Sequence, residues 1–372
     1  MLSSLPPYIL FVFAVILSFA ASLYAVRKTI FITRRMKIYD VPDKIRKIHG
    51  DGIPSLGGIG IFTGYLIVAV FFWPRHHDSM PSIPRDQLFM PAILSSSALL
   101  FFTGIYDDLV NMSPPKKLVS QLLASFITVY FTDIRMEPVF SAIGLGAIPY
   151  WPDVIVTTLT CTFFINVYNF IDGIDGLACS LAILYLGVLG GFFAFSGHQA
   201  LGGMTFALLG ATGGLLFYNL APAKIYMGDT GSMFLGFTIF NFSLLFINWC
   251  SSTEIDIKSI AVHGTTQAVM LVFALLFIPI FDGIRVFILR ASKGISPLKA
   301  DRSHLHYYLL DAGFTHTQAV AVIAGTSAVI VALVWLLQDE HPAILVSGIA
   351  AIALLELGVV YRLRQRKTAV GG

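Results

Sequence analysis

Residues 154–195 read VIVTTLTCTFFINVYNFIDGIDGLACSLAILYLGVLGGFFAF, in which two apolar runs, 154–170 and 176–195, flank a short polar turn. A helix of about 20 mainly apolar residues crosses the hydrocarbon core of a bilayer, and it satisfies its own backbone hydrogen bonds there. The stretch therefore predicts two membrane-spanning helices. The turn between them places Asp172 and Asp175 at the membrane surface.

The rest of the 372-residue chain repeats this pattern. Hydrophobic residues make up 56% of the chain and charged residues 12%, whereas a soluble domain carries about 25% charged residues. Lipid must therefore solvate most of the surface. We predict one all-α integral membrane domain over residues 1–372 with about 11 transmembrane helices. The expected spans are 8–26, 55–73, 88–106, 117–131, 154–170, 176–195, 201–219, 231–249, 267–289, 316–337 and 343–361.

Lysine and arginine predict the orientation, because they are enriched in cytoplasmic loops. With the N-terminus outside, the cytoplasmic segments hold 20 of the 24 basic residues. The tryptophans, which favour the membrane surface, then all fall at outer span ends: Trp73, Trp151, Trp249 and Trp335. We therefore expect an outside N-terminus and a cytoplasmic C-terminus. The cytoplasmic segments are 27–54, 107–116, 171–175, 220–230, 285–315 and 362–372, with Lys117 at a membrane edge.

Two kinds of partner find no support in the sequence. The net charge of +3 gives no basis for a nucleic-acid partner. The three cysteines, Cys161, Cys179 and Cys250, lie in or beside apolar runs and form no CxxC pair. We interpret them as small apolar membrane residues, with no metal or disulfide site among them.

Carboxylates gather at the predicted cytoplasmic ends of spans. Asp107 and Asp108 end the third span, Asp172 and Asp175 lie in the turn quoted above, and Asp229 opens the eighth span. Ionisable groups are costly near lipid and mark function by default. A helix bundle would gather these three segments into one site. Each also has a plainer interpretation, which is a solvated helix end, a polar turn and a helix N-cap, respectively.

The turn within NVYNFIDGIDGLA carries more polar groups than a turn requires. Asp172 and Asp175 are three residues apart, so on a helix they share a face, and Asn169 extends it. Gly173 and Gly176 would let a phosphate or a base approach the backbone. We therefore favour a functional role for this segment.

The segment KIYMGDTGS (224–232) places Asp229 between two glycines at a helix start. Backbone N–H groups at a helix N-terminus favour anions, while the carboxylate favours a metal ion. Asn219 lies ten residues upstream, across the same short loop.

The segment SPLKADRSHLHYYLLDAGF predicts a short interfacial helix that Asp301 caps and Gly313 ends. His304 and His306 are two residues apart, so on a regular helix they would point in different directions. A zinc site is a poor interpretation without a third nearby ligand, and a phosphate site with Arg302 is a better one.

Basic residues over 27–49 are explained largely by anchoring on acidic lipid. Anchoring gives no reason for the glycine-rich GIPSLGGIGIF that follows them.

Taken in order, these segments resemble the polyprenyl-phosphate N-acetylhexosamine-1-phosphate transferases, a glycosyltransferase family. The resemblance covers nearly the whole chain and rests on DVPDKIRKIHG with IPSLGG, YDDL, NVYNFIDGIDGLA, IYMGDTGS and DRSHLH. The His-Leu-His order at the last motif is similar to the WecA/TagO branch, which uses UDP-N-acetylglucosamine. The MraY branch, which transfers a muramoyl-pentapeptide phosphate, usually has three consecutive histidines there.

The resemblance implies a role for each matching position. Catalytic roles fall to Asp107, Asp108, Asp172, Asp175, His304 and His306; substrate binding to Lys117, Asn169, Asn219 and Arg302; and Mg²⁺ binding, with Mn²⁺ as an alternative, to Asp229 and Asp175. Phosphotransfer would proceed directly or through a phospho-aspartate.

The implied function is transfer of N-acetylglucosamine-1-phosphate, or a closely related sugar phosphate, from a UDP-sugar to polyprenyl phosphate with release of UMP. The implied partners are the UDP-N-acetyl sugar and the polyprenyl phosphate lipid. The implied location is the bacterial inner membrane, with a cytoplasmic active site. The reaction would be the first membrane step of polysaccharide synthesis. Phospho-MurNAc-pentapeptide transfer and a multi-pass transporter are the alternatives. The oligomeric state stays open, a homodimer included.

Overall fold

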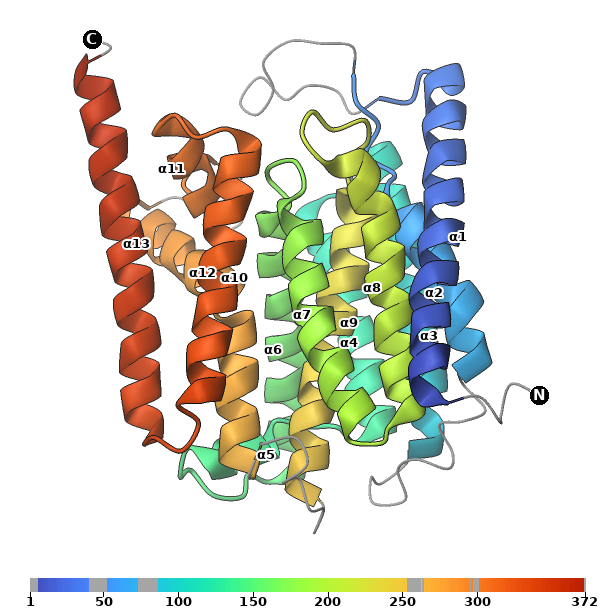
Figure 1. Cartoon of the computed structure of the whole chain (residues 1–372), viewed down its shortest axis with the longest axis vertical. Helices are drawn as coiled ribbons and strands as arrows, with labels where there is room; N and C mark the ends of the chain where they lie inside the picture. Colours follow the sequence, from blue (N-terminus) through green and yellow to red (C-terminus); the bar gives the residue numbers. More distant parts are fainter. Residues whose placement is uncertain are drawn as a thin grey trace.

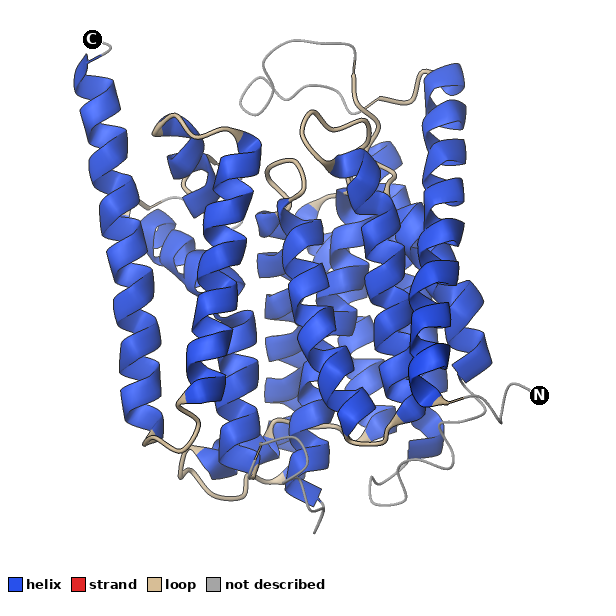
Figure 2. Ribbon diagram, viewed as in Figure 1, coloured by secondary structure: helices blue, strands red, loops and turns tan. Residues whose placement is uncertain are grey.

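The computed structural model describes residues 6–39, 52–72, 86–252, 262, 264–294, 296 and 301–370. In this part of the chain all regular secondary structure is helical, joined by loops, and there is no strand (Figure 2). Its helices are α1 (Pro7–Met36), α2 (Gly58–Phe72), α3 (Asp86–Val110), α4 (Pro114–Thr132), α5 (Glu137–Ala142), α6 (Tyr150–Ile171), α7 (Leu177–Phe195), α8 (Gln199–Asn219), α9 (Gly228–Ser252), α10 (Thr265–Ser292), α11 (Leu305–Asp311), α12 (His316–Leu336) and α13 (Pro342–Val370). The motif DVPDKIRKIHG and Trp73 lie outside the described residues.

Among the described residues, nine helices are long and apolar enough to cross a membrane. They match nine of the expected spans, so the prediction of a multi-pass, all-α membrane protein is confirmed. The other two expected spans coincide with α2, which is a shorter apolar helix of 15 residues, and with α4. The count of eleven therefore stays a prediction.

In this molecule the most apolar helices are the least buried, which is the reverse of the pattern in a soluble protein. The membrane-length windows of α1 and α13 are among the most apolar, yet only 28% and 22% of their residues are buried. The window of α9 is less apolar and entirely buried. Exposing the most apolar helices is favourable only when the solvent around them is lipid.

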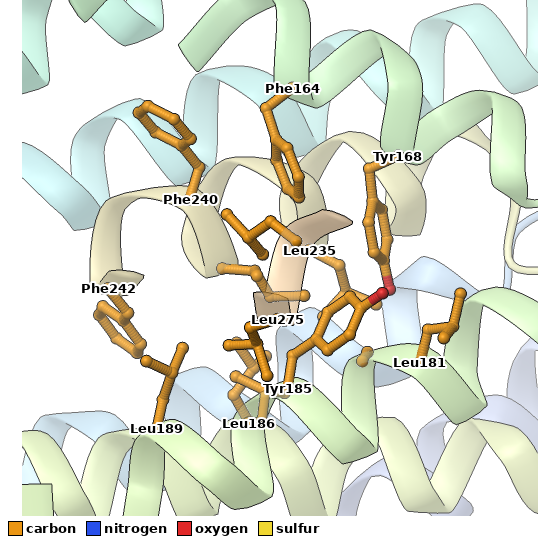
Figure 3. Close-up of a cluster of buried hydrophobic side chains, with 14 of the residues drawn as sticks. Phe164, Tyr168, Leu181, Tyr185, Leu186, Leu189, Leu235, Phe240, Phe242 and Leu275 are labelled. Carbon is orange, nitrogen blue, oxygen red and sulfur yellow. The ribbon is translucent and has the colours of Figure 1, made fainter. Parts of the chain in front are cut away.

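Helix α9 forms the centre of the bundle and packs against α2, α3, α6, α7 and α10. Large apolar side chains surround it on all sides, as expected of a helix that is apolar all round. Figure 3 shows part of this core, where Tyr168 from α6 and Tyr185 from α7 point toward each other. The Tyr168 hydroxyl donates to the backbone oxygen of Ala178 at 2.8 Å, which ties α6 to α7.

Helices α1 and α8 approach each other through small residues, as membrane helices commonly do. A Cβ added at Gly210 of α8 would meet the hydroxyl of Ser18 and the backbone of Val15. A Cβ added at Gly214 would lie 2.8 Å from the backbone oxygen of Phe19. Glycine at these two positions therefore permits the close packing of α1 on α8.

The polar motifs converge on one end of the bundle. Helix α1 begins at the lower end of Figure 1, and α13 ends at the upper end. The α6–α7 turn, the α8–α9 loop and α11 all lie at the upper end (Figure 1). Helix α10 bends partway along its length (Figure 1), and Pro279 inside it removes a helical hydrogen bond.

Candidate active site

The upper end of the bundle contains a polar cavity of about 400 Å³. Residues from five separate parts of the chain line it: Ser55, Asp107, Asp108, Asn111, Lys117, Asn169, Phe170, Asp172, Gly173, Ile174, Asp175, Asn219, Tyr226, Gly228, Asp229, Arg290, His304, Tyr307 and His316. The three carboxylate-bearing segments expected to meet therefore do meet. Of the predicted site residues, His306 and Arg302 do not line the cavity.

Asp108 caps the N-terminus of α9 from a different helix. Its carboxylate accepts hydrogen bonds from the backbone N–H of Asp229 at 2.9 Å and of Thr230 at 3.0 Å, and from the Thr230 hydroxyl at 2.6 Å. The first N–H groups of a helix have no intrahelical partner, so this contact satisfies two of them. Asp108 thereby fixes α9 relative to α3. The plainer interpretation of Asp229 as the N-cap of α9 does not hold, because Asp108 accepts from these N–H groups.

The Lys117 ammonium lies between two carboxylates of the cavity. It donates to Asp107 at 3.3 Å and also to Asp229. Asn169 donates to the other oxygen of Asp229 and to the Ser232 hydroxyl, the latter at 2.7 Å. Asp229 therefore receives donors from α4 and α6, which places the carboxylate in the cavity wall.

The glycine-rich segment before α2 pairs with the loop before α9. The backbone N–H of Tyr226 donates to Pro54 at 2.8 Å, that of Gly57 to Tyr226 at 2.9 Å, and that of Gly58 to Met227 at 2.9 Å. These hydrogen bonds hold in place the loop that leads into α9. This pairing explains the IPSLGG segment, which membrane anchoring did not explain.

The α6–α7 turn presents its two carboxylates differently. Asp172 is half-buried in the cavity wall, and desolvation together with the nearby Asp229 raises its pKa to about 7. Asp175 accepts a hydrogen bond from the backbone N–H of Ala223 at 3.1 Å and lies 3.4 Å from Nδ1 of His316. Because His316 begins α12, this contact ties that helix to the turn.

Asn219 has a positioning role in the described structure. Its carbonyl oxygen accepts from the backbone N–H of Gly176 at 3.0 Å, and its amide donates to the backbone oxygen of Ile225 at 2.9 Å. The side chain thus joins the α6–α7 turn to the α8–α9 loop. Its contribution to a nucleotide site would come through this scaffold.

Residues in the C-terminal half of α10 hold the segment before α11 in place. Nδ1 of His304 lies 2.8 Å from the Asp282 carboxylate, and the backbone N–H of Leu305 donates to the same carboxylate at 3.0 Å. Arg285 donates to Asp282 at 2.6 Å and to the backbone oxygen of Ser303 at 2.5 Å. His304 is also the N-cap residue of α11.

The prediction that Asp301 caps this helix is therefore wrong. Asp301 instead accepts from Arg290 at 2.9 Å and from the backbone N–H of Ser303 at 3.0 Å. Burial alone would raise its pKa, but these donors outweigh burial and hold the pKa at about 2. Arg302 turns away from the cavity to Asp311, at 3.0 Å. His306 is buried, and its ring stacks on that of His304 with centroids 5.6 Å apart.

Sequence reasoning did not find Asp282, Arg290, Tyr307 or His316. Asp282 had a signal, since it is an ionisable residue inside the expected span 267–289 and such residues mark function by default. Arg290 had none, because it was one of many basic residues at cytoplasmic span ends. Its place in the cavity depends on the bend of α10, which sequence periodicity does not reveal.

The donor chemistry of the cavity fits Mg²⁺. Mg²⁺ prefers oxygen ligands and is commonly bound by one or two carboxylates together with substrate phosphates. Asp172 and Asp175 of the α6–α7 turn and Asp229 in the first turn of α9 supply such oxygens. Within the described ranges, no three acidic, histidine or cysteine side chains are preassembled around one point. An ion would therefore depend on the substrate for the rest of its ligands.

The fold and the cavity define a multi-pass membrane protein with an acid-rich polar site at one end of its helices. The family profile described as glycosyl transferase family 4 matches residues 90–247, which contain most of the site. The chain is 30% identical to the probable undecaprenyl-phosphate N-acetylglucosaminyl 1-phosphate transferase of Bacillus subtilis (strain 168), over 83% of this chain and 81% of the relative.

Two further relatives are similar over comparable lengths. The undecaprenyl-phosphate alpha-N-acetylglucosaminyl 1-phosphate transferase of Escherichia coli O157:H7 is 27% identical over 83% of this chain and 79% of its own. The decaprenyl-phosphate N-acetylglucosaminephosphotransferase of Mycolicibacterium smegmatis is 25% identical over 86% and 81%. The chain belongs to glycosyl transferase family 4, so the resemblance drawn from its motifs is confirmed.

Proposed function

We propose that this chain transfers N-acetylglucosamine-1-phosphate from UDP-N-acetylglucosamine to undecaprenyl phosphate, or to a polyprenyl phosphate of the same chemistry, and releases UMP. The names of its relatives support this reaction. The observation that carries it is the meeting of three acid-bearing segments and Lys117 in one cavity at the end of an apolar bundle. A substrate with a phosphate head and a lipid tail requires a site of this kind.

In the proposed reaction, an oxygen of the lipid phosphate bonds to the sugar-linked phosphorus. The bond from that phosphorus to the bridging oxygen breaks, and UMP leaves with the bridging oxygen. A phosphate monoester has a second pKa near 6, so the nucleophile is largely ionised at neutral pH. The harder task is to bring two anionic substrates together.

The positive groups of the cavity address this task. Lys117 provides a fixed ammonium at the level of Asp107 and Asp229. Arg290 lines the same cavity and offers donors to phosphate oxygens. His304 lines the cavity as well. Asp107 faces Lys117 at the end of α3, where it would position the lipid phosphate or accept a residual proton.

Asp229, with Asp175 or Asp172, would hold Mg²⁺ when the donor substrate is present. A bound Mg²⁺ supplies charge neutralisation of the diphosphate. Activity of the purified protein should therefore be lost in EDTA and restored by Mg²⁺ or Mn²⁺. The control is thermal unfolding in EDTA without substrate, which should change little. Full turnover of metal-free protein would contradict the metal role.

The direct test is UMP release by purified protein in detergent, from UDP-N-acetylglucosamine with and without undecaprenyl phosphate. Mass spectrometry should identify a polyprenyl-diphosphate-linked N-acetylhexosamine. A panel of other UDP-sugars, including UDP-MurNAc-pentapeptide, tests the donor, and the pentapeptide donor should give no product. A transporter would release no UMP from any of them, and that result would end the proposal.

We further propose that the site faces the cytoplasm of a bacterial plasma membrane and that the product begins polysaccharide assembly. The 20 of 24 basic residues on one side of the expected topology support this orientation.

A further inference from the structure

Asp282 is a carboxylate inside α10 that is only 3% exposed. It receives four donors from two elements. Arg285, one turn further along α10, donates twice to Oδ1, at 2.6 and 3.2 Å. The backbone N–H of Leu305 donates to Oδ1 at 3.0 Å, and Nδ1 of His304 lies 2.8 Å from Oδ2.

The arginine alone would satisfy the charge of Asp282. A buried carboxylate needs an opposite charge and hydrogen-bond donors, and the guanidinium supplies both. Nevertheless, the second carboxylate oxygen, Oδ2, contacts the imidazole of His304, which lines the cavity. Because Arg285 already pairs with Asp282, we interpret the contact with Nδ1 as a constraint on the ring of His304.

The contact determines which ring nitrogen of His304 carries a proton. An ionised carboxylate only accepts hydrogen bonds, so Nδ1 of His304 must be protonated. The other nitrogen, Nε2, is then the one available to a ligand in the cavity. Arg285 completes the arrangement because it also donates to the backbone oxygen of Ser303, which fixes the residue before the histidine.

We propose that Asp282 is a positioning residue for the phosphotransfer, acting through His304: it holds Nδ1–H, orients the ring and directs Nε2 toward a phosphate in the cavity. This inference rests on the proposed function. Carboxylates that orient a functional imidazole from behind are a recurring device, and losing one commonly lowers activity about 10- to 100-fold.

The test is a double-mutant cycle of Asp282→Asn, His304→Ala and the two together, measured as UMP release per folded molecule. Asp282→Asn should lower kcat/KM by about 10- to 100-fold. It should lower it no further in the His304→Ala background, because the group through which it acts is absent. An equal fold loss in both backgrounds would mean that Asp282 acts on the structure and would overturn the proposal.

Asp153→Asn is the matched control. Asp153 is fully buried and paired with Arg135 at 2.8 Å, at the opposite end of α6 from the cavity. Its loss should lower the thermal unfolding temperature, as for any broken buried pair, while UMP turnover per folded molecule stays unchanged. A turnover loss equal to that of Asp282→Asn would assign both effects to general destabilisation.

A second measurement needs no folded Asp282 variant and no activity. In wild-type protein labelled with ¹⁵N-histidine, the signals lost in His304→Ala belong to His304, and they should show a protonated Nδ1. An unprotonated Nδ1 would overturn the proposal. Wild-type protein that releases no UMP overturns the proposed function and the role of Asp282 in it, whereas an active wild type with an additive cycle overturns the role of Asp282 alone.

Discussion

Asp107 and Asp108 are neighbours in the sequence, yet their carboxylates have different partners. Asp108 accepts three hydrogen bonds at the N-terminus of α9, whereas Asp107 faces Lys117 and accepts from the backbone N–H of Met112 at 2.5 Å. The two neighbouring acids therefore have different roles. Asp108 holds α9 in place, and Asp107 is the one that faces Lys117 in the cavity.

We predict that Asp108→Asn and Asp107→Asn separate stability from activity. Asp108→Asn should lower the free energy of unfolding by about 1–3 kcal/mol, because its NH₂ replaces one accepting oxygen and leaves a donor of α9 unpaired, and it should also reduce UMP release. Asp107→Asn should reduce UMP release with a smaller change in thermal unfolding. Equal losses of stability in the two variants would contradict this division of roles.

Gly228 is a residue of the cavity wall at which a side chain cannot be accommodated. Its φ of +71° is unfavourable for other residues, and an added Cβ would lie 2.6 Å from the Asp108 carboxylate. Gly228→Ala should therefore displace Asp229 and abolish most UMP release. Gly191→Ala in α7 is the control, since nothing lies within 4 Å of its added Cβ. Its stability should rise by up to about 1 kcal/mol, and turnover should stay at the wild-type level.

At the scale of elements, the apolar spans and the segments bearing acids could be predicted, because span length and ionisable residues leave direct marks in a sequence. The contribution of α10 to the site could not be predicted. Its bend brings Asp282 and Arg290 to the site, and a proline in a helix gives no direction for the bend. The cap on α9 could not be predicted for a related reason: the carboxylate that accepts from its first N–H groups comes from Asp108 of α3, and no local sequence pattern contains both elements.

The packing of α1 on α8 gives a prediction for this pair of helices. Gly210→Val would force a side chain against Ser18 and the backbone of Val15, and overpacking of this kind costs about 1–3 kcal/mol. Thermal unfolding in detergent should shift to lower temperature, with turnover per folded molecule retained. Gly213→Ala is the control, because its added Cβ would meet Phe19 only at 3.4 Å. A similar shift in both variants would show that the small-residue contact is unimportant.

For the whole molecule, the proposed function requires that the acid-bearing end face the cytoplasm. The native cysteines are all buried, so a background that lacks them accepts single reporters. Leu145→Cys, in the exposed α5–α6 loop, should react with an impermeant thiol reagent on intact cells. Lys224→Cys, in the loop before α9, should react only after the membrane is opened. Labelling of Lys224→Cys in intact cells would place the cavity outside, where UDP-sugars are absent.

The pairing of α1 with α8 also has a consequence for the order of assembly during synthesis. More than 160 residues separate the end of α1 at Met36 from the start of α8 at Gln199. At a synthesis rate of about 5–20 residues per second, α1 waits roughly 8–30 s in the bilayer before its main partner is made. Its high apolarity and low final burial suit that interval, because a helix that is stable alone in lipid needs no chaperone while its neighbour is still inside the ribosome.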